Sequence, residues 1–269
     1  MYAASSREAL AGARSVLEPA TGSAAAAATV GDELLEVSRL LGENRELLST
    51  LTEAAVPPAE RTAVARGVLS GKVADATGEV VGAAVGGQWS TSTDLASGLH
   101  DLGVEALLRS ASAAGTGDTV EDELFRLGRI IASDAALEQA LSDRARPVAD
   151  RVGLLRSLIA GKVNPVTEKL ALDAIERSSL QPADALAALA DTAAAISGRR
   201  VAHVRAAEAL TDAQRQRLAS ELEADLGSPV TLHVDVDPAL LGGVVVRVGN
   251  EQIDGSVAGK FAAVRRGLR

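Results

Sequence analysis

The sequence contains no cysteine, which excludes disulfides, thiolate metal sites and cysteine nucleophiles. Aromatic residues make up only 1% of the chain, although 47% of it is hydrophobic. The cores must therefore consist of alanine, leucine and valine, a composition that suits close-packed helices better than a wide ligand pocket. The three histidines, His100, His203 and His233, lie far apart and match no metal-ligand spacing. We expect no cofactor, no metal and no catalytic residues.

A basic surface and a long apolar run are also missing. The net charge is −9 and the isoelectric point is near 5.0, whereas nucleic-acid binding needs a basic footprint. We therefore expect no nucleic-acid partner. No run of about 18 apolar residues is present, so no direct membrane insertion is expected. The amino terminus lacks a basic start followed by an apolar run, so we expect no signal peptide.

The first two thirds of the chain contain an internal repeat. Residues 32–73 and 122–163 align without a gap at an offset of 90 residues (161 − 71). Gapless alignment that also preserves the apolar positions indicates tandem duplication of a folded unit. Positions that carry identical residues in both copies include Asp32, Glu33, Leu34, Arg39, Leu47, Leu51, Pro57, Arg61, Gly71, Lys72 and Val73.

The repeated unit has helical periodicity. Leu34, Val37 and Leu41 recur at three- and four-residue spacing, as do their counterparts in the second copy. Proline 57 and its counterpart suit a first helical turn, and Gly71 and Gly161 suit left-handed helix caps. Residues 92–119 should be mostly helix, shared between the two bundles, with the alanine run after Gly22 in a loop or frayed helix end.

The last third changes to a mixed pattern. Residues 200–208 and 230–237 alternate apolar with polar side chains, as half-buried strands do. Between them we predict a helix that begins with a Thr211–Gln214 capping box and ends at Gly227. A further strand and a final helix from Val257 to Leu268 should follow. The predicted fold is mainly α with a small α+β C-terminal domain: two tandem helical bundles (1–104 and 105–198), then a strand–helix–strand–strand–helix unit (199–269).

Residues 237–260, DPALLGGVVVRVGNEQIDGSVAGK, could suggest a phosphate-binding loop. A loop of that kind needs glycines at fixed spacing before a Lys and a hydroxyl residue, between a strand and a helix. Here Lys260 falls inside the expected final helix, and the pattern G-x-G-x-x-G is missing. We interpret the glycines as turn residues instead. The residues with expected structural roles are Asp237, Pro238, Gly242, Gly243, Gly249, Asp254, Gly255 and Ser256.

The same stretch resembles the carboxyl-terminal motif of the delta subunits of bacterial F-type ATP synthase, called the oligomycin-sensitivity-conferring protein in mitochondria. That motif has the form V-D-P-x-L-[IL]-G-G-x-x-[VI]-x-[VI]-G-x-x-x-[IV]-D-G-S-[VI]. The chain departs from the family pattern at its amino terminus, and in having the 90-residue unit twice where ordinary members have one bundle. The matching residues are Val236, Asp237, Pro238, Leu240, Leu241, Gly242, Gly243, Val246, Val248, Gly249, Ile253, Asp254, Gly255, Ser256 and Val257.

The resemblance implies a non-catalytic stator at the cytoplasmic face of the cell membrane, a single copy within a hetero-oligomer. In that family the bundle binds the amino-terminal helices of the alpha subunits, and the carboxyl domain binds the b-type stalk helix. The family arrangement implies a partner groove lined by Leu10, Leu17, Val81, Val85 and Trp89; the alternative is that these five residues form ordinary core. It leaves open which bundle contacts the head. Two functions remain as alternatives to the stator: second, a free-standing helical-repeat adaptor unrelated to ATP synthesis, and third, an enzyme.

Overall fold

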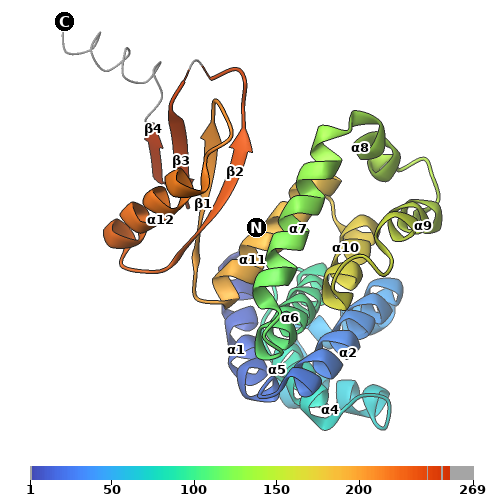
Figure 1. Ribbon diagram of the computed structural model, residues 1–269. Helices are drawn as coiled ribbons and strands as arrows, with labels where there is room; N and C mark the ends of the chain where they lie inside the picture. The colour runs from blue at the N-terminus through green and yellow to red at the C-terminus, as the bar shows by residue number, and fades with distance from the viewer. Residues whose placement is uncertain (1, 241, 250, 255–269) are drawn as a thin grey trace, which may run out of the picture. The chain divides into compact units, whose positions relative to one another are not determined.

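The computed structural model describes residues 2–240, 242–249 and 251–254 (Figure 1). In this part of the chain, eleven helices precede a strand–helix–strand–strand–strand unit, which confirms a mainly α fold with a small α+β domain. The helices are α1 (Ala4–Ala20), α2 (Ala24–Glu43), α3 (Arg45–Thr52), α4 (Pro58–Leu69), α5 (Asp75–Gly86), α6 (Ser92–Ala113), α7 (Gly117–Ser133), α8 (Ala135–Ser142), α9 (Val148–Ile159), α10 (Pro165–Arg177), α11 (Pro182–Ile196) and α12 (Asp212–Leu226). The strands are β1 (Arg200–Ala206), β2 (Val230–Val236), β3 (Val244–Val248) and β4 (Glu251–Asp254).

The helix boundaries repeat at the offset found in the sequence. Helices α3 and α8 begin and end 90 residues apart, as do α4 and α9, and α5 and α10 begin 90 residues apart. Gly71 and Gly161, which follow α4 and α9, have the same φ of 69°. The left-handed caps predicted for both copies are therefore confirmed.

Helix α6 occupies two places in the repeat. Its residues 94–110 align with α1 at the 90-residue offset, whereas its first residue, Ser92, aligns with Pro182, the first residue of α11. One continuous helix therefore ends the first set of helices and begins the second. The predicted boundary between residues 104 and 105 lies inside this shared helix.

The chain divides into two compact units, one formed by Met1–Val120 with Gly153–Asp173 and the other by Glu121–Val152 with Ala174–Arg269. In the first unit, α2 and α6 approach closely where both carry glycine. A Cβ on Gly31 would lie 2.8 Å from Cγ of Leu107, and one on Gly103 would lie 3.1 Å from the Gly31 carbonyl oxygen. The surrounding core contains leucine, valine and alanine, as the composition predicted.

The second unit contains a four-stranded sheet with the order β2-β1-β3-β4. β1 and β2 are parallel and are connected through α12, whereas β3 is antiparallel to both β1 and β4. Valines of β1, β2 and β3 form its core together with Leu222 of α12. The capping box at Thr211 and the left-handed cap at Gly227, with φ of 64°, are both present.

Some local predictions need correction. The alanine run after Ser23 lies inside α2 because the Ser23 hydroxyl accepts from the Ala26 N–H and caps the helix there. Pro57 precedes the first turn of α4, which begins at Pro58. Strand β4 was not predicted, and it pairs with β3 through residues that are exposed on both faces. The predicted final helix, with Gly255 and Ser256, lies outside the described residues.

Candidate partner-binding sites

The five residues predicted to line a partner groove meet in one hydrophobic cluster. Leu10 and Leu17 of α1 and Val81 and Val85 of α5 are buried, and Trp89, after α5, is partly buried against them. The Trp89 indole N–H donates to the carbonyl oxygen of Ala84 at 2.8 Å. The five side chains hold α1 and α5 together within the chain, and their contact with a partner stays a prediction.

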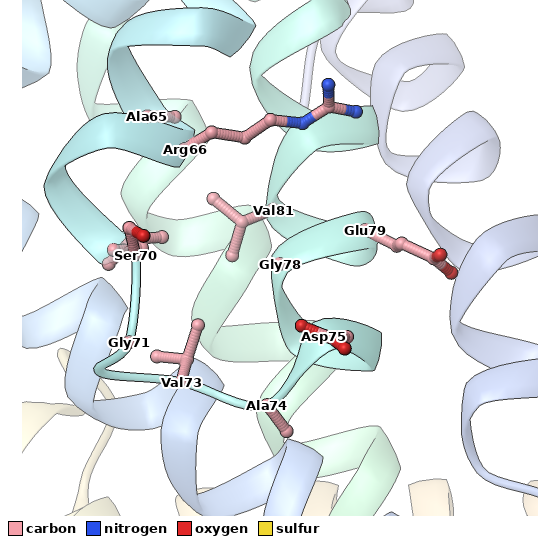
Figure 2. Close-up of a pocket in the computed structure, with 11 residues that line it drawn as sticks. Ala65, Arg66, Ser70, Gly71, Val73, Ala74, Asp75, Gly78, Glu79 and Val81 are labelled. Atoms are coloured by element: carbon pink, nitrogen blue, oxygen red, sulfur yellow. The ribbon is translucent and has the colours of Figure 1, made fainter.

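A groove opens beside this cluster, between α4 and α5 (Figure 2). Its volume is about 440 Å³. Ala65, Leu69 and Val81 are buried at its floor, while Arg66 and Glu79 are exposed at its rim. Figure 2 shows Val81 pointing into the space between the two helices and Glu79 pointing away from it. An apolar floor with charged edges matches the two faces of an amphipathic helix.

The second copy carries larger side chains at two groove positions. Ala65 corresponds to Leu155, and Gly78 corresponds to Glu168, at the offset of 90 residues. No heavy atom beyond its own helix and chain neighbours lies within 4 Å of a Cβ built on Gly78, so this glycine leaves open space in the groove. The two copies therefore share their helices but differ in the surface between the fourth and fifth helix.

The carboxyl-terminal motif builds turns around the sheet. Asp237 directly follows β2: its N–H donates to the Ala206 carbonyl at 2.8 Å, and its carboxylate accepts from the Ala239 N–H at 3.0 Å. Pro238 follows it within this turn. Gly242 and Gly243, before β3, have φ of 140° and 82°, and Gly249, between β3 and β4, has φ of 58°. Such angles favour glycine, so these residues shape the backbone. Asp254 is the last residue of β4 and pairs with Val245.

A second cluster, which the sequence analysis missed, contains Asp191 of α11, His203 of β1 and His233 of β2. His203 Nε2 lies 3.2 Å from Asp191 Oδ2, and His233 Nδ1 lies 3.4 Å from Asp191 Oδ1. The other ring nitrogen of His233 lies 3.4 Å from Oε1 of Glu121, whose second oxygen accepts from Arg199. The two histidines lie side by side because the parallel register of β1 and β2 places His203 opposite His233.

The environment of this cluster shifts two pKa values in opposite directions. Burial works toward a higher pKa for Asp191, but His203 and His233 outweigh it and lower the pKa to about 2. Burial works toward a lower pKa for His233, but the carboxylates of Asp191 and Glu121 outweigh it and raise the pKa above its usual value. The cluster thus combines carboxylates and imidazoles in one partly buried network.

The fold defines a helical-repeat protein with a small α+β domain. Among the described residues, no helix combines the length and apolar character needed to cross a membrane. A family model described as ATP synthase delta (OSCP) subunit matches residues 104–268. The chain also resembles the ATP synthase subunits delta of Nocardia farcinica, Rhodococcus opacus and Corynebacterium urealyticum over most or all of its length.

The subunit of Nocardia farcinica is 50% identical over 269 residues, covering 100% of both chains. That of Rhodococcus opacus is 47% identical and covers 100% of this chain and 99% of its own. That of Corynebacterium urealyticum is 46% identical and covers 90% of this chain and 89% of its own. The chain belongs to the ATP synthase delta (OSCP) subunit family. It is a non-catalytic stator subunit of the peripheral stalk of F-type ATP synthase, and the free-standing adaptor is not supported.

Proposed function

We propose that the helical part of the chain holds the amino-terminal helices of alpha subunits and that residues 199–269 bind the b-type stalk helix. The segments 1–104 and 105–198 are then two head-binding modules, and residues 199–269 are the stalk-binding module. The subunit would lie at the cytoplasmic face of the cell membrane as one copy within the complex. This arrangement links the head to the stalk through one chain.

The groove between α4 and α5 is the observation that supports a helix-binding role for the first copy. Its floor residues Ala65, Leu69 and Val81 are apolar, and Arg66 and Glu79 at its rim can select the register of a partner helix by charge. The family model begins at residue 104, which supports a correspondence between the second copy and the family's single bundle. The first copy therefore adds a binding site to the one that the family usually has.

Gly78 provides a direct test of this groove. A Gly78→Glu substitution places in the first copy the side chain that the second copy carries at the equivalent position, Glu168. Because a Cβ there meets no other atom within 4 Å and glycine is a poor helix former, the helix should tolerate the change. Gly67→Glu is the matched control, since Gly67 also has free space and does not line the groove.

The experiment is calorimetric titration of the full chain with a peptide of the alpha amino-terminal segment. We expect Gly78→Glu to weaken binding at one site at least about tenfold, which corresponds to about 1.4 kcal/mol, while Gly67→Glu stays within twofold of the unmodified chain. Equal binding by the two variants would contradict the assignment of the groove. Binding of a b-type helix by residues 199–269 is tested in a separate titration.

A further inference from the structure

The buried atoms of Asp191 and His233 present a chemical problem that the stator role does not explain. Oδ1 of Asp191 and Nδ1 of His233 are buried without a hydrogen bond, and they lie only 3.4 Å apart. The His233 side chain is 3% exposed. Such groups normally have a partner, because an unsatisfied polar atom away from water is costly.

His233 lies between two carboxylates. Its Nε2 faces Glu121, which is held by Arg199 from the other side, and its Nδ1 faces Asp191, each at 3.4 Å. When a metal ion displaces the proton between Nδ1 and Asp191, the Glu121 carboxylate keeps a proton on Nε2 and Nδ1 presents its lone pair. Nδ1 of His233 and Oδ1 of Asp191 then direct two electron pairs toward the same ion.

His203 completes a three-donor set. Its Nε2 lies 3.2 Å from the second oxygen of Asp191, and one ligand atom from each of Asp191, His203 and His233 lies within 4.8 Å of the others. In a tetrahedral zinc site, ligand distances of about 2.0–2.2 Å place neighbouring donor atoms about 3.3–3.6 Å apart. Asp191 and His203 are partly exposed, with side chains 41% and 27% accessible, so small rotations can close the remaining gap.

We propose that Asp191, His203 and His233 form a binding site for a divalent transition-metal ion of the zinc class, with Glu121 as the residue that orients His233. Two imidazoles and a single carboxylate favour zinc, nickel or copper over magnesium and calcium, which prefer oxygen ligands. The ligands come from α11, β1 and β2. The bound ion therefore fastens the last helix of the second repeat to the sheet that follows it.

Zinc titration of the full chain tests this site. The chain must carry no polyhistidine tag, and it is first stripped with a chelator. Zinc is then added in competition with a chromophoric chelator, and thermal unfolding is recorded with zinc and with magnesium. We expect one saturable zinc per chain and a higher melting temperature with zinc but not with magnesium, because a ligand that binds only the folded state stabilises it.

Three variants and one control identify the ligands. We expect His203→Gln and Asp191→Asn each to weaken zinc binding at least tenfold, and Glu121→Gln to weaken it about tenfold to a hundredfold by releasing His233. His100→Gln is the control, since His100 pairs with Asp173 in the other compact unit and should leave the affinity unchanged. Circular dichroism verifies that each variant is folded.

Nuclear magnetic resonance of the unsubstituted chain provides a measurement that does not depend on variants. The sequence contains three histidines, so the ring signals are few. Zinc should shift the ring nitrogens of His203 and His233 and leave those of His100 in place. No saturable binding, equal affinity in His203→Gln, or ring shifts confined to His100 would each overturn the proposal.

Discussion

Gly71 and Gly161 lie 90 residues apart and share a φ of 69°, each two residues after the last residue of the fourth helix of its copy. In both copies the following N–H, of Lys72 and Lys162, donates to the carbonyl of the third residue before it at 2.9 Å. The same turn has thus been kept in both copies while the neighbouring side chains have diverged. The duplication preserved the backbone of the unit and changed its surface.

Alanine at either glycine should destabilise the protein. We expect Gly71→Ala and Gly161→Ala each to lower the free energy of unfolding by about 1–2 kcal/mol, because a left-handed conformation is costly for a residue with a Cβ. No steric clash contributes, since a Cβ at either site meets nothing within 4 Å. Gly67→Ala, inside α4, is the control and should stabilise by about 0.5–1 kcal/mol. Urea denaturation followed by circular dichroism measures all three, and an unchanged midpoint for Gly71→Ala would contradict this account.

The contact between α2 and α6 predicts that two glycines of α2, Gly31 and Gly42, differ in their tolerance of alanine. Gly31→Ala should cost about 1–3 kcal/mol, because its Cβ would lie 2.8 Å from Cγ and 3.0 Å from the backbone nitrogen of Leu107. Gly42→Ala, near the end of the same helix, has no atom within 4 Å and should be neutral or stabilising. Thermal unfolding of both variants gives the two melting temperatures to be compared. Equal shifts would mean that the helices do not approach as closely as described.

Arginines that donate to backbone carbonyls occur at equivalent positions in both copies, Arg61 buried and Arg151 partly buried. Arg61 donates to the carbonyls of Gly86 and Gly87 at 3.4 and 3.2 Å, and Arg151 donates to those of Leu141 and Ile175 at 3.2 Å each. Arg61→Met should destabilise by about 1–3 kcal/mol because the partly buried carbonyls of Gly86 and Gly87 lose a donor.

The control for this arginine is Arg39→Met. Arg39 is half exposed and pairs with Glu36 and Glu43 on its own helix, so its loss should cost at most about 0.5 kcal/mol. Denaturation in urea distinguishes the two variants. If Arg61→Met lowers the free energy of unfolding no more than Arg39→Met does, the end of α5 does not depend on the Arg61 side chain.

The repeat itself predicts that one copy can be removed. Deleting residues 65–154 joins the first half of α4 to the second half of α9 at equivalent positions and removes one repeat length. We expect a chain with a single bundle, a cooperative melt and an intact carboxyl-terminal domain. Loss of cooperative melting would show that the two copies cannot fold as interchangeable modules.

The sequence predicted those features that depend on local chemistry. The capping box at Thr211 and the helix ends at Gly71 and Gly161 need only a few neighbouring residues, and the repeat is visible as identity at a fixed offset. Strand β4 escaped prediction because all four of its residues are exposed and its sequence lacks alternation. It is defined by pairing with β3 rather than by its own pattern.

The candidate sites depend on contacts between residues distant in the sequence. The groove depends on the packing of α4 against α5, which the sequence does not show. The difference between Gly78 in the first copy and Glu168 in the second, however, is visible in the alignment of the repeats. The cluster of Asp191, His203 and His233 needs the return of the chain from α11 into β1 and the parallel register that pairs the two histidines. Neither long-range pairing has a signature in spacing or periodicity.

Photo-crosslinking within the assembled ATP synthase tests the central claim most directly. A photoreactive residue replaces Glu79 at the groove rim, and in a matched experiment it replaces Glu36, an exposed glutamate on α2 away from the groove. The account predicts that position 79, and not position 36, crosslinks to the amino-terminal segment of an alpha subunit, as identified by mass spectrometry. Crosslinks to that segment from position 36 but not from 79, in an assembled and active complex, would contradict it.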